Sequence, residues 1–152
     1  MLREAGREAA RSRDQHPRLL AARQSGRRQL KTDYELGARR PRPIVPVVVK
    51  AEIKSLAIQF EWGSAKQRAL DELLRELPIA DVSSEAVIDA YARLDNESRK
   101  LGHRMGKNDL WIAALTAVQN AVIVTTDQDF DHLNQRFVAV ERIVIATLGI
   151  AG

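Results

Sequence analysis

The 152-residue chain has no cysteine and few aromatic residues, which make up 5% of its length. Without thiols it can have no disulfide framework, no thiol nucleophile and no zinc or iron–sulfur site with cysteine ligands. A bound metal would have to use hard oxygen ligands or the three histidines. Those histidines, His16, His103 and His132, show no metal-ligand spacing.

The chain also lacks a long apolar run. No stretch approaches the roughly 20 consecutive apolar residues of a membrane-spanning helix, and the first 13 residues lack the apolar core of a secretory signal. The contents of 45% hydrophobic and 29% charged residues are close to the averages for soluble globular domains. We therefore expect a cytoplasmic chain that is one domain by size and has no membrane contact.

Basic charge is concentrated at the amino end. The formal net charge is +4, but residues 1–43 hold 12 Lys or Arg against 5 Asp or Glu, whereas residues 44–152 hold 12 against 15. A mildly acidic domain that handles RNA would need divalent cations or a basic arm to approach the phosphates. Net charge alone does not decide between these two routes.

Apolar periodicity predicts strands that alternate with helices. The most apolar strands do not alternate between apolar and polar residues, which is typical of parallel strands buried on both faces. The sequence therefore predicts an α/β layer fold around a mainly parallel sheet. The expected strands are 44–49, 79–82, 121–127, 137–140 and 142–150, and the expected helices are 50–60, 64–77, 83–102 and 108–120, with one or two more in 18–36.

Three carboxylates follow strands or begin helices, where α/β domains place their sites. Glu52 comes directly after IVPVVV, Asp109 opens an apolar helix, and Asp127 closes the strand AVIVTT. Taken singly, each has an ordinary explanation, because an acid in a first helical turn interacts favourably with the helix dipole and an acid after a strand is a common turn residue.

Three blocks of sequence make the pattern specific. They are AEIKSLA at 51–57, MGKNDLWIAA at 105–114 and TTDQDFDHL at 125–133. Together they closely resemble the PIN-domain ribonucleases of the VapC toxin family. The resemblance covers about residues 19–133.

The resemblance implies a PIN-like α/β/α sandwich and a metal-dependent nuclease. In this family, acids bind Mg²⁺ or Mn²⁺ and the enzyme cleaves single-stranded RNA, as the toxin of a type II toxin–antitoxin pair. Carried over residue by residue, Glu52, Asp109 and Asp127 correspond to metal-binding acids, and Asp129 is a further catalytic candidate. The expected partners are an RNA substrate, a cognate antitoxin and a second copy of the chain.

Polar neighbours of these acids have two interpretations each. Asn108 could orient an acid, but we favour a helix N-cap. Thr125 and Thr126 could position phosphate or water, although threonines in buried strands are more often structural. His132 follows an acid, yet the family resemblance places no base there.

Aromatic and basic residues near these blocks could contact nucleic acid. Trp62 and Trp111 could stack on bases, but core packing is favoured for Trp111 because its helix is apolar on nearly every face. The stretch that holds His103, Arg104 and Lys107 could meet a phosphate or be a solvated loop, and the two interpretations carry equal weight.

The amino end departs from the family pattern. PIN domains begin with a hydrophobic strand that ends in Asp-Thr-Asn, and the aspartate is a principal metal ligand. Here the corresponding place is RDQHP at 13–17, where Asp14 is the only acid and Pro17 suits a central strand poorly. We therefore expect the first central strand to be missing or altered, residues 1–18 to be an atypical basic segment and 19–152 to be the PIN-like domain.

Two functions from different classes follow from this departure. The first is the Mg²⁺-dependent ribonuclease toxin, and the second is a catalytically impaired PIN-fold module that binds an antitoxin or itself. A phosphorylated receiver-type domain is disfavoured, because no strand near the amino terminus ends in paired acids.

Overall fold

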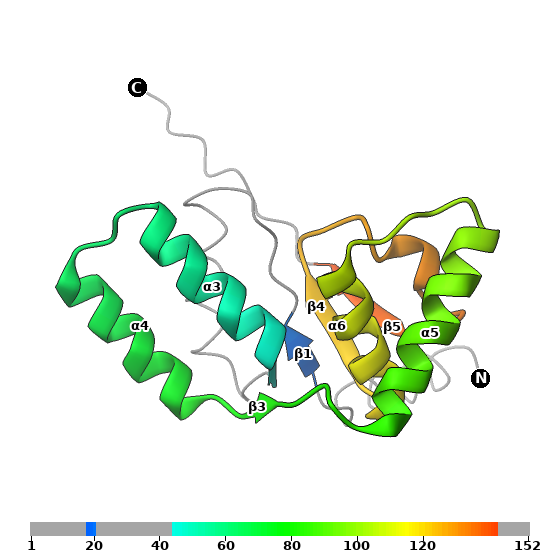
Figure 1. The fold of residues 1–152 in the computed structure, drawn as a ribbon, viewed down its shortest axis with the longest axis horizontal. Coiled ribbons are helices and arrows are strands. Elements are labelled where there is room, and N and C mark those ends of the chain that lie inside the picture. Colours follow the sequence, from blue (N-terminus) through cyan, green and yellow to red (C-terminus); the bar gives the residue numbers. More distant parts are fainter. Residues whose placement is uncertain (1–17, 21–43, 143–152) are drawn as a thin grey trace, which may run out of the picture.

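Short strands and longer helices alternate in the residues that the structure, a computed structural model, describes: 18–20 and 44–142 (Figure 1). Expectations for 1–17, 21–43 and 143–152 lie outside this part. In chain order the elements are β1 (Arg18–Leu20), β2 (Val45–Pro46), α3 (Val47–Gln59), α4 (Ser64–Glu76), β3 (Ile79–Ala80), α5 (Glu85–Lys100), α6 (Lys107–Val118), β4 (Val122–Thr125), the 3₁₀ turn η1 (Asp131–Leu133) and β5 (Ala139–Arg142).

Every pairing between these strands is parallel. One sheet has the order β1-β4-β5, and β2 pairs with β3 in a second sheet. β1 also contacts β2, so it lies between the two groups of strands. The expected α/β fold with a parallel sheet is confirmed.

The first strand differs from the helix predicted over residues 18–36. Arg18–Leu20 form a strand, in which Leu20 is paired with Val124. Periodicity cannot assign so short an apolar run, and here pairing with β4 decided its conformation. The sequence predicts the altered strand before residue 18, a place outside the described residues, and the strand described here is Arg18–Leu20.

The valines after Pro46 also differ from the prediction of a strand over residues 44–49. The strand ends at Pro46, which is the N-cap of α3 with φ −57° and ψ 143°. Proline has no N–H for a sheet ladder, and the helix begins at Val47. The β preference of valine is weak compared with burial, and Val49 is fully buried on α3.

The remaining helices begin and end within two residues of the predicted bounds. α4 follows Gly63 and ends two residues before Pro78. The backbone N–H of Val87 donates to the Ser84 hydroxyl at the start of α5, at 3.4 Å. Beyond α5, Gly102 has φ +79°, a left-handed conformation that glycine adopts without steric cost.

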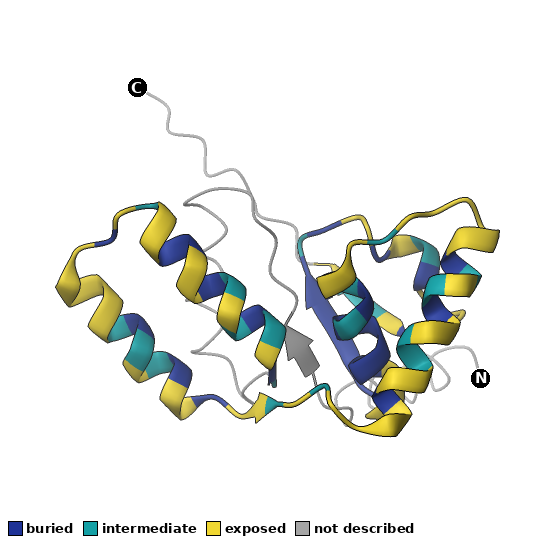
Figure 2. Ribbon diagram, in the orientation of Figure 1, coloured by how far each residue is buried: buried dark blue, intermediate teal, exposed yellow. Residues whose placement is uncertain are grey.

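α6 is the central buried helix. Ile112, Ala113 and Ala114 are fully buried, and the helix contacts α3, α5 and β4. Figure 2 shows buried residues concentrated along β4 and on α6 beside it. An apolar helix without a polar face is expected where several elements surround it.

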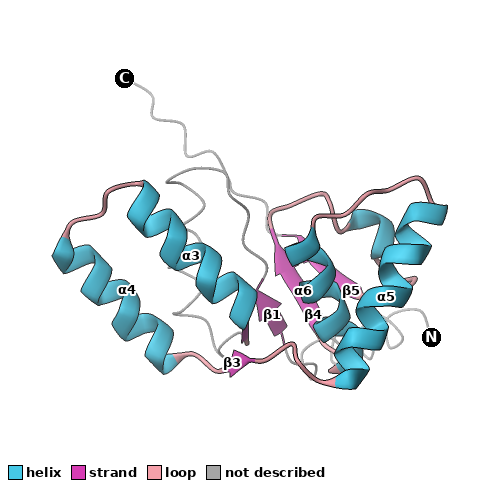
Figure 3. Cartoon of the chain, viewed as in Figure 1, coloured by secondary structure: helices cyan, strands magenta, loops and turns pink. Residues whose placement is uncertain are grey.

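Two helix pairs flank the strands. α3 and α4 form an antiparallel pair on one side of β1, and α5 and α6 lie on the other side (Figure 3). In the described part of the chain, no helix combines the length and the apolar character needed to cross a bilayer.

We expect Ile112→Ala to lower the free energy of unfolding by about 2–5 kcal/mol, because it leaves a cavity in the core. Val118→Ala, on the same helix but 43% exposed, should change it by less than about 1 kcal/mol. Urea unfolding followed by circular dichroism measures both changes. Equal losses in the two variants would show that α6 is not the buried centre.

Candidate active site

The three predicted acids lie at the carboxyl edge of the sheet. Asp127 follows β4, and Asp109 is in the first turn of α6. Because α6 leads into β4 and runs back along it, the start of α6 lies near the end of β4. Glu52 is on α3, which follows β2 directly. This edge is where α/β folds place their ligands.

Glu52 is held by Asn108. The Nδ2 of Asn108 donates a hydrogen bond to Oε1 of Glu52 at 2.6 Å, across 56 residues of sequence. The favoured interpretation of Asn108 as an N-cap is therefore wrong. The N-cap of α6 is Gly106, and no side chain caps it. Asn108 instead joins α6 to α3 through its hydrogen bond with Glu52.

Asp109 leans back over the start of its own helix. A Cβ atom at Gly106 would lie 2.9 Å from Oδ2 of Asp109, closer than real contacts allow. The backbone of Gly106, with φ −63° and ψ 151°, has a conformation that any amino acid can adopt. A side chain at 106 would therefore move the half-buried Asp109 carboxylate from its present position.

Asp127 is fixed by the turn that follows β4. Its side chain is buried, with 5% of the residue exposed. Its backbone N–H donates to Oγ1 of Thr125 at 3.0 Å, and its Oδ1 accepts from the N–H of Asp129 at 2.9 Å. Thr125 thus has the structural role that the sequence favoured. The exposed Asp129 is oriented by Asp127 through its backbone.

The acids do not form a complete metal cluster within the described residues. No group of three or more His, Asp or Glu there could hold a metal ion. The family's first acid follows strand one, but Ala21, Ala22 and Arg23 follow β1. Asp14 precedes that strand and lies outside the described residues.

The chemistry of the donors nevertheless fits a divalent cation. Glu52 and Asp109 supply hard oxygen ligands, and Mg²⁺ is usually bound by one or two protein carboxylates together with water and substrate phosphates. These two are the described residues that could hold the ion, and Asp127, which follows β4, is the third acid that the family resemblance assigns.

Sequence patterns do not predict the cluster around Ser98. This fully buried serine, at the end of α5, has its hydroxyl 3.1 Å from Nε2 of His132 and 3.4 Å from the sulfur of Met105. The rings of His103 and His132 stack with centroids 4.3 Å apart. The cluster joins α5 to η1 and so supports the loop that carries Asp127, and only the tertiary fold brings its members together.

The two tryptophans are engaged in packing. Trp111 is half-buried, and its ring lies 4.3 Å from that of Tyr91 on α5, at 40°. Trp62 is buried, with Nζ of Lys66 3.6 Å from its ring centroid. The contact between Trp111 and Tyr91 supports the packing role that the sequence favoured for Trp111.

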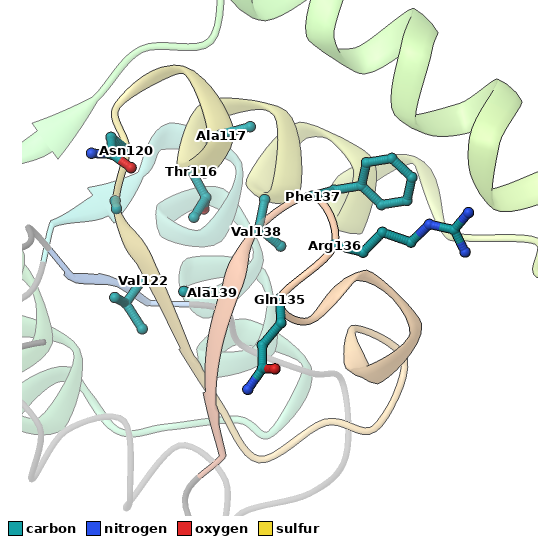
Figure 4. A pocket seen from close by; sticks show the side chains of 10 residues that line it. Thr116, Ala117, Asn120, Val122, Gln135, Arg136, Phe137, Val138 and Ala139 are labelled. Atoms are coloured by element: carbon teal, nitrogen blue, oxygen red, sulfur yellow. The ribbon is translucent and has the colours of Figure 1, made fainter. Parts of the chain in front are cut away.

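A small cavity lies away from the acids. Its volume is about 290 Å³, and Figure 4 shows Asn120 and Val122 at the start of β4 opposite Gln135 and Phe137 near the start of β5. None of its lining residues is acidic. It lies at the amino ends of these strands, whereas Asp127 follows the carboxyl end of β4.

We expect the stability of the chain to fall as pH drops from about 7 to 5. Burial first, and then the positive charge of His103, hold the pKa of His132 below its ordinary value of 6.5. The unfolded chain therefore takes up a proton before the folded chain does, and this favours unfolding below about pH 6.5.

Melting temperatures between pH 7 and 5 test this dependence. His132→Gln removes the titrating ring, so its melting temperature should fall less over that range than that of the unsubstituted chain. A variant with an unchanged slope would assign the pH dependence to other groups.

Comparisons with known proteins agree with the fold. The PIN domain family model matches residues 18–135. A member of the VapBC toxin–antitoxin family, VapBC-5 from Mycobacterium tuberculosis, has a TM-score of 0.61 and 25% identity, covering 86% of this chain and 99% of that one. No curated protein matches.

Two further solved structures show the same fold. VapBC2 from Rickettsia felis, bound to a DNA fragment from its promoter, has a TM-score of 0.62 and 19% identity over 84% of this chain and 98% of that one. FitAcB from Neisseria gonorrhoeae has a TM-score of 0.58 and 20% identity, covering 81% of this chain and 95% of that one. The predicted resemblance is confirmed: this chain belongs to the PIN-domain family, and its structural neighbours include members of VapBC toxin–antitoxin systems.

Proposed function

We propose that this chain is the nuclease toxin of a type II toxin–antitoxin system and cleaves single-stranded RNA with Mg²⁺ or Mn²⁺. One observation carries the proposal: the 2.6 Å hydrogen bond from Asn108 to Glu52. It joins the acid of α3 to the residue beside Asp109, at the edge of the sheet where Asp127 also lies. This contact supports a shared site for the acids of α3 and α6.

The acids are suited to hold a hard cation. Glu52, Asp109 and Asp127 would bind the ion, which would activate a water molecule and neutralise charge on the scissile phosphate. Asp127 keeps the loop after β4 in place, because its Oδ1 accepts the N–H of Asp129. Arg104 precedes α6 and Lys107 is its first residue. Both are exposed and would attract the RNA backbone to an otherwise acidic edge.

The proposed partners follow from the neighbours. The M. tuberculosis and R. felis structures are of VapBC toxin–antitoxin systems. We accordingly propose a cognate antitoxin for this chain. From the sequence alone we also propose self-association as a homodimer, a cytoplasmic location, and a PIN-like domain over 19–152 that follows a basic segment over 1–18.

A second candidate is supported by a specific observation. β1 is followed by Ala-Ala-Arg, and the described residues contain no group of three acids that could hold a metal. Loss of one ligand weakens a metal site. The chain would then be an antitoxin-binding module with impaired catalysis.

Asp109→Asn should abolish RNA cleavage and leave folding little changed, because it removes a ligand charge and keeps the side-chain shape. Glu52→Gln and Asp127→Asn should also abolish RNA cleavage, whereas Asp14→Asn should reduce it much less. Cleavage of a labelled single-stranded RNA in Mg²⁺ or Mn²⁺ measures the effect. Asp89→Asn, at an exposed position on α5, is the matched control.

Two outcomes would contradict the mechanism: full activity in excess chelator, or an unimpaired Asp109→Asn protein. If the unsubstituted chain binds the antitoxin encoded by the neighbouring gene but cleaves no RNA in either metal, the second candidate is correct.

Ala21→Asp should tighten Mn²⁺ binding in calorimetric titration. It places a carboxylate directly after β1, whose last residue pairs with Val124 just before the segment that leads to Asp127. Ala92→Asp, on the exposed face of α5, adds the same charge elsewhere and should leave the affinity unchanged. Equal gains in both variants would indicate general charge attraction rather than a completed site.

A further inference from the structure

We propose that Asn108 is a positioning residue, which holds the Glu52 carboxylate at the amino end of α6 in the orientation that a divalent cation requires. This inference rests on the proposed function. Asn108 would not touch the metal or the RNA, and it would act only through Glu52.

The geometry of the contact sets the orientation of the acid. Asn108 Nδ2 lies 2.6 Å from Glu52 Oε1, and the two residues come from different helices. Within the described residues this is the only hydrogen bond to the Glu52 side chain. The amide thus holds one carboxylate oxygen, and no described residue forms a hydrogen bond to Oε2.

Neither helix capping nor packing accounts for Asn108. The N-cap position belongs to Gly106, and Asn108 lies inside the first turn of α6, where asparagine is a poor helix former. Its side chain is exposed, so it buries little apolar surface. The hydrogen bond to Glu52 is the one contact that the structure gives this side chain among the described residues.

The choice of an amide has a chemical reason. Lysine or arginine at this place would form an ion pair with Glu52 and compete with a metal ion for its charge. A neutral amide donor fixes one oxygen and leaves the negative charge for the cation. Hydrogen-bond partners of metal ligands act in this way, and their loss typically costs about 10–100-fold in metal affinity.

The test is a double-mutant cycle on the full chain, with Mn²⁺ affinity from calorimetry as the readout. Asn108→Leu keeps the number and branching of the side-chain heavy atoms and cannot donate, so it should weaken Mn²⁺ binding about tenfold. In a Glu52→Gln background the same change should have less than about a twofold effect. Asn108→Gln, which keeps the amide, should bind more tightly than Asn108→Leu.

The control is Asn96→Leu, an identical change at an exposed position of α5, which should leave the affinity unaltered. Equal weakening by Asn108→Leu in both backgrounds would mean that Asn108 is merely structural and would overturn the proposal. The proposal is also overturned if Asn108→Leu does not weaken Mn²⁺ binding in the chain that retains Glu52.

Failure of the proposed function gives a different result. If the unsubstituted chain binds no Mn²⁺, the metal-dependent function is wrong, and side-chain amide NMR signals of the metal-free chain then decide the orienting role. Glu52→Gln should shift the Asn108 amide signal and leave that of Asn96 in place. An unmoved Asn108 signal would overturn the orienting contact.

Discussion

The burial of α6 is the constraint on which the described fold depends. With Ile112, Ala113 and Ala114 fully buried, this helix must be covered by α3, α5 and β4 together. Because a helix surrounded on several sides cannot shift without opening cavities, its first turn has a fixed place relative to its neighbours. The candidate site uses that turn: the core positions Asn108 and Asp109, and polar contacts adjust them.

The site itself is built from contacts between elements. Glu52 depends on Asn108 of α6, while Asp127 depends on the hydroxyl of Thr125 and in turn orients the backbone of Asp129. Further along, the buried Ser98 hydroxyl contacts His132 and supports η1 from α5. A rigid frame therefore carries polar groups that a cation and a phosphate could use, although residues 21–23, which follow β1 in the sequence, include no acid.

Much of the local structure could be read from the sequence. Ser84 and Gly102 marked the ends of α5, and the unbroken apolar pattern of α6 and β4 indicated elements buried on several sides. Local patterns failed where two structures compete for the same residues. Leu20 lay in a segment with helical spacing but joined a sheet, and Val47 and Val49 have β preference but form a helix after Pro46. In both cases contacts with distant residues outweighed weak local propensity.

The sequence by itself determined the family, the α/β class and the identity of the candidate acids, because these depend on residue types and on their order along the chain. Only the tertiary structure decided what each polar neighbour does. Asn108 fitted a helix cap equally well until α3 placed Glu52 2.6 Å from its amide, and Ser98 carried no signal until η1 placed His132 beside it. Such contacts join residues 34 and 56 positions apart, and a local pattern cannot contain them because they exist only once the core has fixed the distances between helices.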